Sequence, residues 1–225
     1  MTMVAVTEGY RMWAPTYSEE TAISSLENDA VKALTPTLAG RRLLDAGCGT
    51  GRRLRSAGAA IAIGVEPVPE MVAAGVAVDG PLTDVEIVTG DVRHIPMPSR
   101  AFDVVWCRLV LGHLPSIGEA YAELARVADY GATVVVSDFH AAAVEAGHRR
   151  SFRAGAKVIE LEHYVHRAED HIEAASVAGL VFRDMRESAI GPDVRSFYER
   201  AGKIGEYARH AGLPVVLTLS FRRER

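Results

Sequence analysis

Three glycines at alternate positions follow a short apolar run that contains one acidic residue. The run is Leu43-Leu44-Asp45-Ala46-Gly47-Cys48-Gly49-Thr50-Gly51, and the helix-compatible residues 52–55 come next. Glycine accepts positive φ and lets the backbone approach a ligand without a Cβ in the way. The first N–H groups of a following helix face such a ligand with the positive end of the helix dipole. The stretch therefore predicts a strand, a tight ligand-binding turn and a helix start.

The spacing of these glycines separates two classes of ligand. Dinucleotide-binding proteins use G-x-G-x-x-G, with a pyrophosphate at the helix N-terminus. This chain has G-x-G-x-G, with Asp45 two residues before Gly47. A carboxylate there would repel a pyrophosphate, but it could orient the loop and approach an amino-acid ammonium group. A nicotinamide-dependent oxidoreductase is therefore disfavoured, whereas a glycine turn in some other α/β protein stays open at this point.

The motif D-x-G-x-G-x-G, from Asp45 to Gly51, resembles motif I of the class I S-adenosylmethionine (SAM) methyltransferases. The N-terminal stretch Y-x-x-W-A-x-x-Y, from Tyr10 to Tyr17, is similar to that of the ubiquinone/menaquinone-biosynthesis type, in which it folds over the SAM site as a lid. That resemblance implies that Tyr17 touches the cofactor, whereas Tyr10 and Trp13 lie closer to the substrate. The alternative is that these aromatic residues only pack the next helix onto the domain.

Acidic residues also mark the ends of the next two expected strands. The buried-strand run 61–66 ends in Glu66, whose carboxylate can accept hydrogen bonds from two adjacent ribose hydroxyls. After the strand expected at 84–89, Gly90-Asp91-Val92 matches the "G-D-apolar" sequence of the same family. The resemblance implies that Asp91 binds the adenine amino group and that the Val92 backbone binds a ring nitrogen. For Asp91, an Asx turn is the structural alternative.

These positions together predict a site for SAM. The implied cofactor-binding residues are Tyr17, Asp45, Gly47, Cys48, Gly49, Gly51, Glu66, Pro67, Met71, Gly90, Asp91, Val92 and Cys107. In this interpretation Met71 lies against the adenine ring, and the Cys107 backbone carbonyl accepts from the cofactor ammonium group. The spacing of histidine, cysteine and acidic residues indicates no metal site.

Histidines are the candidates for catalysis. Methyl transfer from a sulfonium is an in-line displacement that depends mainly on holding donor and acceptor close and aligned. A hydroxyl acceptor also requires a base to take its proton, and histidine suits this role. The first candidates are His140 and His163, after the strand at 132–138, and His113, after the strand at 101–107, is the third. An amine or an activated carbon needs no such base, so the acceptor atom (O, N or C) stays open.

Alternating strand and helix patterns must position these residues. The expected helices are 19–38, with Ser18 as N-cap, 116–127, with Ser116 and Glu119 as a capping box, 168–178 and 193–210. The expected later strands are 101–107, 132–138, 180–185 and a hairpin-like strand at 215–221. This alternation of strands and helices predicts an α/β fold, a Rossmann-like three-layer sandwich with a mostly parallel seven-stranded sheet and an antiparallel last strand. Ligands bind such sheets at the carboxyl ends of the strands.

Length and composition set the remaining expectations. The 225 residues predict a single methyltransferase domain, 1–225, with an N-terminal lid helix at about 8–38 and a substrate-side insertion at about 139–167. The net charge of −4 and the pI near 6.1 give no basic field for nucleic acid. The Asn/Asp-Pro-Pro-aromatic stretch of adenine-N6 methyltransferases is also missing. No signal peptide or membrane-length apolar run is visible, and the two cysteines fit a reducing cytoplasm.

The expected function is SAM-dependent methyl transfer to a small-molecule acceptor. The expected protein is a monomer or homodimer without a nucleic-acid or membrane partner. Two alternatives stay open from the sequence: a SAM-binding subunit or regulator without its own activity, and a protein or RNA methyltransferase. The sequence names neither the acceptor nor the pathway.

Overall fold

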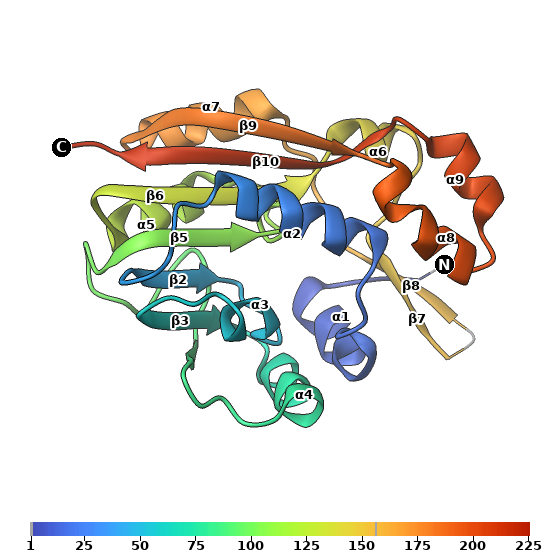
Figure 1. Cartoon of the computed structure of the whole chain (residues 1–225), viewed down its shortest axis with the longest axis horizontal. Helices are drawn as coiled ribbons and strands as arrows, with labels where there is room; N and C mark the ends of the chain where they lie inside the picture. Colours follow the sequence, from blue (N-terminus) through green and yellow to red (C-terminus); the bar gives the residue numbers. More distant parts are fainter. Residues whose placement is uncertain (1, 156) are drawn as a thin grey trace.

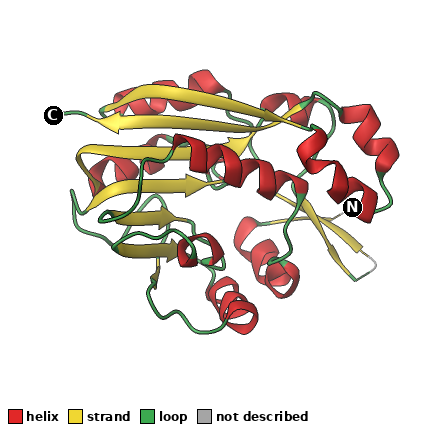
Figure 2. Ribbon diagram, in the orientation of Figure 1, coloured by secondary structure: helices red, strands yellow, loops and turns green. Residues whose placement is uncertain are grey.

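A computed structural model describes residues 2–155 and 157–225. A seven-stranded sheet has the order β4-β3-β2-β5-β6-β10-β9 (Figure 2). Its strands are β2 (Arg42–Ala46), β3 (Ile61–Glu66), β4 (Glu86–Thr89), β5 (Phe102–Arg108), β6 (Ala128–Phe139), β9 (Leu180–Ala189) and β10 (Pro214–Arg223). Pairings from β4 to β6 are parallel, whereas β10 is antiparallel to both β6 and β9. The predicted α/β Rossmann-like sandwich, with an antiparallel last strand, is confirmed.

Helices cover both faces of this sheet because its central strands are apolar on both sides. In Figure 1, α2 (Ala22–Leu34) and α3 (Arg52–Arg55) lie on one face, and α5 (Gly118–Val127) and α7 (Ala168–Val177) lie on the other. Successive side chains of a strand point to opposite faces. Leu43 accordingly packs with Val31 of α2, whereas Leu44 packs in the cluster that contains Leu124 of α5. Apolar residues at every position are typical of strands buried on both faces.

The helix predicted at 19–38 is shorter than its pattern suggested. The chain first makes α1 (Val6–Trp13) and a 3-10 turn (Ala14–Thr16), and α2 starts only at Ala22. Ser18 is not the N-cap. Thr21 caps α2 instead, because its hydroxyl accepts from the Ser24 N–H at 3.1 Å and the Ser24 hydroxyl accepts from the Thr21 N–H at 2.9 Å. The helix ends at Leu34, since the residue before Pro36 is disfavoured in helical conformation.

The predicted boundary between the helix at 116–127 and the strand at 132–138 is also wrong. Helix α5 starts at Gly118 without a side-chain cap, so Ser116 and Glu119 form no capping box. Strand β6 begins directly at Ala128. Gly131, expected to end the helix, lies inside β6 with a φ of 79°, where the register with β5 shifts. An extra unpaired stretch of this kind is a β-bulge, which glycine accommodates.

The C-terminal elements differ from the prediction in length. The helix expected at 193–210 is divided into α8 (Arg195–Arg200) and α9 (Ile204–His210) by Gly202, whose φ is 66°. Strand β9 continues past the expected end at 185 to Ala189, because β10 supplies an antiparallel partner along this length. Strand β10 pairs with β6 as well, so it is an interior strand and not one arm of an isolated hairpin.

A second, three-stranded sheet joins the N-terminus to the 139–167 region. Strand β1 (Thr2–Val4) runs parallel to β8 (Lys157–Leu161), and β7 (Ser151–Ala154) is antiparallel to β8. Helix α1 lies beside this sheet (Figure 1), and the Trp13 ring stacks on Phe152 with centroids 5.0 Å apart. We call β1, α1, β7 and β8 the cap. Short helices α4 (Pro69–Asp79) and α6 (Ala141–Glu145) complete the elements near the site.

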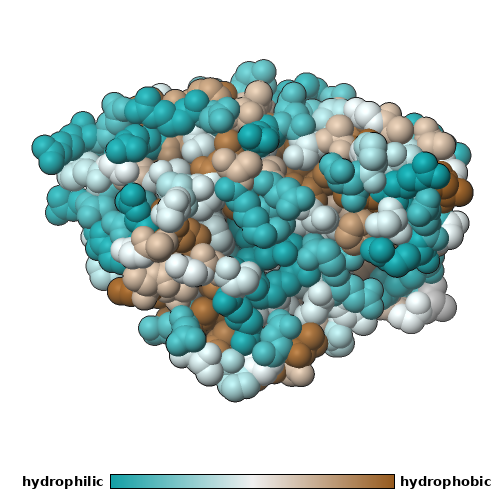
Figure 3. Space-filling view, viewed as in Figure 1, coloured by the Kyte–Doolittle hydropathy of each residue, from teal (hydrophilic) through white to brown (hydrophobic). Residues whose placement is uncertain are grey.

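The face of the molecule seen in Figure 1 is mainly hydrophilic. Figure 3 shows hydrophobic atoms there only in small groups. Within residues 2–155 and 157–225, every helix is too short or too polar to traverse a lipid bilayer.

Candidate active site

The main cleft opens where the parallel strands of the large sheet end, beside α1 of the cap. Its walls come from α1, the glycine loop after β2, and the residues that follow β3, β4 and β5. The predicted cofactor residues that line it are Tyr17, Gly47, Gly49, Glu66, Pro67, Met71, Asp91 and Val92. Parallel strands bring their carboxyl ends to the same edge, so residues far apart in sequence meet here.

The glycine loop makes two sharp reversals that only glycine tolerates without strain. The φ values of Gly47, Gly49 and Gly51 are 83°, 58° and 73°. The N–H groups of Gly47 and Cys48 both donate to the Val65 carbonyl, at 2.8 and 3.0 Å, which anchors the loop on β3. Helix α3 follows for a single short turn. The loop therefore exposes backbone on the cleft wall with no side chain in the way.

Glu66 lies at the end of β3 with its carboxylate on the cleft wall. Its two oxygens accept from the Gly49 N–H at 2.9 Å and from the Val68 N–H at 3.0 Å. The side chain is buried, and this burial raises the pKa of Glu66 to about 6 against the opposing effect of the two N–H donors. A carboxylate offers about four lone-pair sites, so two are left for hydroxyl donors.

Asp45 lies under the glycine loop and not on the cleft wall. It is 2% exposed, and its Oδ1 has no hydrogen-bond partner in the described part of the chain. Burial raises the pKa of Asp45 to about 7. An unpartnered buried carboxyl oxygen is costly. A cationic group that reached it would remove that cost, so the residue fits the ammonium group of a SAM molecule.

The side of the cleft where the sequence predicts adenine binding is formed by residues after β3 and β4. Met71 is almost fully buried under the cleft, next to Pro67. Asp91 is half-buried and holds the exposed Arg93 in a two-pronged ion pair, with N–O distances of 2.9 and 2.7 Å. The Arg93 side chain lowers the pKa of Asp91. Asp91 also accepts from the Arg93 N–H at 2.8 Å, which is an Asx turn, but its carboxylate still faces the cleft.

The other predicted cofactor residues are placed around the loop and away from the cleft wall. Gly51 caps α3, and Cys48 packs against Gly64. A Cβ on Gly90 would meet Pro96 at 2.7 Å, so this glycine permits close packing of the loop after β4. Cys107 is fully buried in β5, and only its backbone could reach a ligand. Both thiols have raised pKa values because they are buried.

Three aromatic residues from the α1 region close the cleft. The rings of Trp13 and Tyr17 contact edge to face with centroids 5.0 Å apart, and Tyr10 stacks on Trp13 at 5.9 Å. Tyr17 lies above Gly49, since a Cβ there would stand 3.7 Å from its ring. Burial raises the pKa of Tyr17. Of the three, Tyr10 and Tyr17 line the main cleft, and Trp13 lies behind them against the cap.

His113 is the predicted catalytic histidine that lines the main cleft. Its Nδ1 donates to the Glu162 carbonyl at 3.2 Å, so Nε2 carries the lone pair and accepts from the Tyr10 hydroxyl at 2.9 Å. The same hydroxyl accepts from Nη2 of Arg150 at 2.9 Å. Burial, with a smaller effect of Arg150, lowers the pKa of His113 to about 3. The imidazole is therefore neutral at physiological pH.

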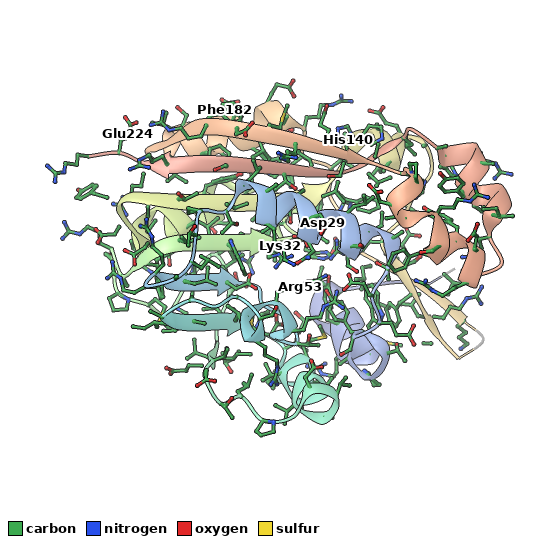
Figure 4. The ribbon with its side chains drawn as sticks, viewed as in Figure 1. Asp29, Lys32, Arg53, His140, Phe182 and Glu224 are labelled. Atoms are coloured by element: carbon green, nitrogen blue, oxygen red, sulfur yellow. The ribbon has the colours of Figure 1, made fainter. Side chains whose placement is uncertain are left out.

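His163 and His140 lie outside the lining of the main cleft. The His163 ring contacts His113 edge to face at 6.0 Å, and its buried Nε2 has no partner among the described residues. His140 instead caps α6 by accepting from the Ala142 N–H at 3.1 Å, and its Nε2 lies 2.9 Å from Glu187 of β9. Figure 4 shows His140 near β9 and β10, well apart from Arg53 on the α3 side.

Several cleft residues were not singled out from the sequence. They are Val6, Thr7, Val68, Arg93, Arg108, Leu109, Val110, Leu114, Pro115 and Arg150. The stretch after β5 follows the end of a central strand, which is a signal in the sequence, whereas the φ of 55° at Leu109, unusual for a side-chain-bearing residue, is visible only in the structure. Arg150 lies within the expected substrate-side insertion at about 139–167, but no motif singled it out, since it reaches the cleft only through the fold of the cap.

Metal ligands are not gathered anywhere in the described part of the chain. Among residues 2–155 and 157–225, no three His, Cys, Asp or Glu side chains lie close enough to hold a metal ion.

Comparisons with known proteins agree with this geometry. Residues 44–136 match the model of a methyltransferase domain. A SAM-dependent methyltransferase from Mesorhizobium loti superposes with a TM-score of 0.67 at 20% identity, over 90% of this chain and 100% of that one. Geranyl diphosphate C-methyltransferase from Streptomyces coelicolor A3(2), solved with S-adenosyl-L-homocysteine, gives 0.61 at 17% identity, over 93% and 87%. These likenesses show the fold, that of the class I SAM-dependent methyltransferases.

A closer relative shows the family. The chain is 30% identical over 217 residues to 27-O-demethylrifamycin SV methyltransferase from Amycolatopsis mediterranei (strain S699). The alignment covers 84% of this chain and 80% of the relative. The chain therefore belongs to the SAM-dependent methyltransferases, and SAM is its cofactor. The predicted enzyme class and cofactor are confirmed.

Proposed function

We propose that this protein transfers the methyl group of SAM to a hydroxyl group of a small molecule. The observation that carries the proposal is a second cavity, the side hollow, which shares Tyr17, Leu109 and Arg150 with the main cleft. An acceptor in the side hollow would therefore meet a cofactor in the main cleft. The relative that acts on 27-O-demethylrifamycin SV, by its name a small-molecule enzyme, supports an acceptor of this kind.

The chain's own residues suit the binding of SAM. Glu66 would accept from the ribose hydroxyls, Asp91 from the adenine amino group, and Asp45 would attract the ammonium group from under the loop. Met71 gives the adenine ring an apolar wall. When bound, SAM supplies an electrophilic methyl group on a sulfonium. Tyr17 and the glycine loop would hold it in line with the acceptor, and positioning of this kind is worth roughly 7–11 kcal/mol in intramolecular reactions.

Of the three predicted histidines, His113 is the best placed to take the acceptor's proton. Its Nε2 accepts from the Tyr10 hydroxyl, which lines the cleft, and the Glu162 carbonyl fixes this tautomer, so the acceptor's proton would reach Nε2 through the Tyr10 hydroxyl. The pKa of about 3 makes His113 a weak base. A phenol is a stronger acid than an alcohol, so a phenolic hydroxyl would lose its proton to so weak a base more readily than an alkyl hydroxyl. His163 would support the His113 ring, and His140 would cap α6.

The same proposal covers the organisation of the protein. We infer one methyltransferase domain, 1–225, in which the region 8–38 forms the lid and the 139–167 region supplies the acceptor side. Packing of Trp13 on Phe152 supports this arrangement, because it joins the two regions. A monomer or homodimer in the cytoplasm, without a nucleic-acid or membrane partner, fits the net charge of −4 and the free thiols of Cys48 and Cys107.

The test combines binding with turnover. Calorimetry should show binding of SAM and of S-adenosylhomocysteine. SAM with a labelled methyl group, incubated with panels of phenols, alcohols and amines, should give labelled methyl ethers of phenols. Binding without transfer to any panel would favour a regulator without its own activity, and transfer to protein or RNA in place of phenols would also contradict the proposal.

A further inference from the structure

Arg150 stands between the two cavities, at the point where the cap meets the large sheet. It lies between α6 and β7, and it is half-buried. It lines both the main cleft and the side hollow. A side chain in this position faces whatever occupies the acceptor site.

Arg150 differs from the other arginines of the main cleft in its partners. Arg108 forms a buried ion pair with Glu27 at 2.6 Å, and Arg93 pairs with Asp91 at 2.7 Å. Within residues 2–155 and 157–225, Arg150 has no carboxylate within 4.0 Å. Its hydrogen bonds there go to the Tyr10 hydroxyl, from Nη2 at 2.9 Å and from Nε at 3.3 Å.

This pairing leaves donors of the guanidinium unused. A guanidinium has five N–H donors in a fork that matches carboxylate and phosphate oxygens. A charged group removed from bulk water needs an opposite charge and full hydrogen bonding to offset its desolvation. A neutral phenol hydroxyl supplies only part of this. Arg150 is half-buried, and its nitrogens are not among the buried side-chain atoms of the described residues that lack a partner, so its unused donors are accessible to an anion in the cavities.

The rest of the side hollow indicates what carries that anion. Trp13, Leu109 and Phe139 form an apolar and largely aromatic wall, and Ser24 and Ser151 add hydroxyl groups. The acidic lining residue, Glu19, is exposed, so water screens its charge. Arg149 also lines the hollow, but it is exposed and lies 3.7 Å from Glu160, so Arg150 is the half-buried arginine beside the apolar walls.

We propose that the acceptor carries an anionic group, a carboxylate or a phosphate, that pairs with Arg150 while its apolar part lies against Trp13 and Phe139. This inference rests on the proposed function, because it identifies the substrate class of the same site. In the ternary complex Arg150 would fix the acceptor's orientation, and Tyr10 would remain bonded to both Arg150 and His113.

Calorimetry on protein saturated with S-adenosylhomocysteine tests the proposal with three small probes that share a phenyl ring. Benzoate and phenyl phosphate carry the anion, and benzamide is the neutral match for benzoate. We expect at least one anion to bind about tenfold or more tightly than benzamide, as a charge-assisted pair should. The better of the two anions distinguishes a carboxylate from a phosphate acceptor.

Variants assign the preference to this side chain. In Arg150→Gln the anion preference should fall to about twofold or less, and Arg150→Lys should keep part of it, since charge remains without the fork. Arg153→Gln, an exposed change on the same hairpin, should keep all of it. Equal binding of benzoate, phenyl phosphate and benzamide to the wild type, or full preference in Arg150→Gln, overturns the inference.

Two controls separate this result from other failures. An unchanged dissociation constant for S-adenosylhomocysteine shows that Arg150→Gln is folded. If that variant does not fold, Arg150→Lys decides, because its anion preference should be lower than that of the wild type. Absence of an anion preference in a wild-type protein that binds S-adenosylhomocysteine and methylates neutral phenols removes only this inference. Failure to bind S-adenosylhomocysteine in the wild type removes the proposed function itself.

Discussion

The backbone N–H of Gly49 donates to Oε2 of Glu66 at 2.9 Å, so the glycine loop after β2 is tied to the end of β3. The other carboxylate oxygen accepts from the Val68 N–H, at the start of α4. One acidic side chain thus fixes two backbone segments of the main cleft and still offers lone pairs to a ligand. Loop geometry and ligand binding therefore depend on the same carboxylate.

Replacing Glu66 should weaken cofactor binding. Glu66→Ala removes hydrogen bonds to a charged acceptor, which typically contribute about 1.5–3 kcal/mol, and it also frees the loop. Calorimetric titration with S-adenosylhomocysteine measures the loss. Glu86→Ala, an exposed change on the neighbouring strand β4, is the control. An unchanged dissociation constant in Glu66→Ala would remove this residue from the site.

Gly49→Val should abolish cofactor binding. The φ of 58° is unfavourable for a β-branched residue, and the new side chain would project between Met71 and Tyr17. Gly58→Val is the matched control, because Gly58 has a φ of 69° but open space around it. Both variants should lose similar stability in thermal unfolding, whereas only Gly49→Val should lose binding of S-adenosylhomocysteine. Full binding by that variant would contradict the placement of the cofactor.

Asp45 should make both stability and binding depend on pH. Its pKa in the folded chain, about 7, is above the ordinary 3.8, so between these values the folded protein holds a proton that the unfolded chain has lost. The contribution of Asp45 to stability is therefore largest below pH 3.8 and is lost as the pH rises through 7. Urea unfolding of the unliganded wild type and of Asp45→Asn should show this difference in slope.

An ammonium group near Asp45 would favour its ionised form. Binding of S-adenosylhomocysteine at a pH of about 6.5 should therefore release protons. Because phosphate and Tris take up the released protons with different enthalpies, the binding enthalpy measured in the two buffers should differ. Asp45→Asn should reduce this difference. Identical enthalpies of the wild type in the two buffers would show that the ligand does not reach this carboxyl.

Alanine substitutions of the three histidines should have different effects on turnover with a phenolic acceptor. His113→Ala should lower kcat by about 10²–10⁴-fold with little change in the binding of S-adenosylhomocysteine, because it removes the proton acceptor. His140→Ala should leave kcat within about twofold, since His140 contacts Glu187 and α6 outside the main cleft. His163→Ala should have an intermediate effect through the His113 ring. If all three variants retain full turnover, none of these three histidines acts as the base.

The ion pair of Glu27 and Arg108 should dominate the stability of the α2 face. The two side chains are 4% and 7% exposed, and the Ser137 hydroxyl also donates to Glu27 at 2.8 Å. Glu27→Ala leaves a buried charge unpaired and should cost about 3–5 kcal/mol in urea unfolding. Glu20→Ala, which breaks exposed pairs with Arg52 and Arg53, should cost less than about 1 kcal/mol. Equal losses of stability in the two variants would mean that burial does not determine how much an ion pair stabilises the protein.

The sequence by itself determined the large sheet and the cofactor side of the main cleft. A short, mainly apolar run such as 43–46 that ends in a glycine turn favours a buried strand, and the glycines after it have the positive φ that such a turn needs. Parallel strands end at one edge, so Glu66 and Asp91 had to meet there. These features depend on local patterns that short stretches of sequence contain.

Only the tertiary structure decided which side chains face the acceptor. Strand β1 pairs with β8 across more than half the chain, and this pairing brings Arg150 to Tyr10 and His113. The sequence placed His140 and His163, in the substrate-side insertion, ahead of His113, whereas in the structure His113 is the one of these three that lines the main cleft. Which histidine reaches the cleft depends on the direction of single side chains and on long-range contacts. A periodic pattern of polarity in the sequence does not contain this information.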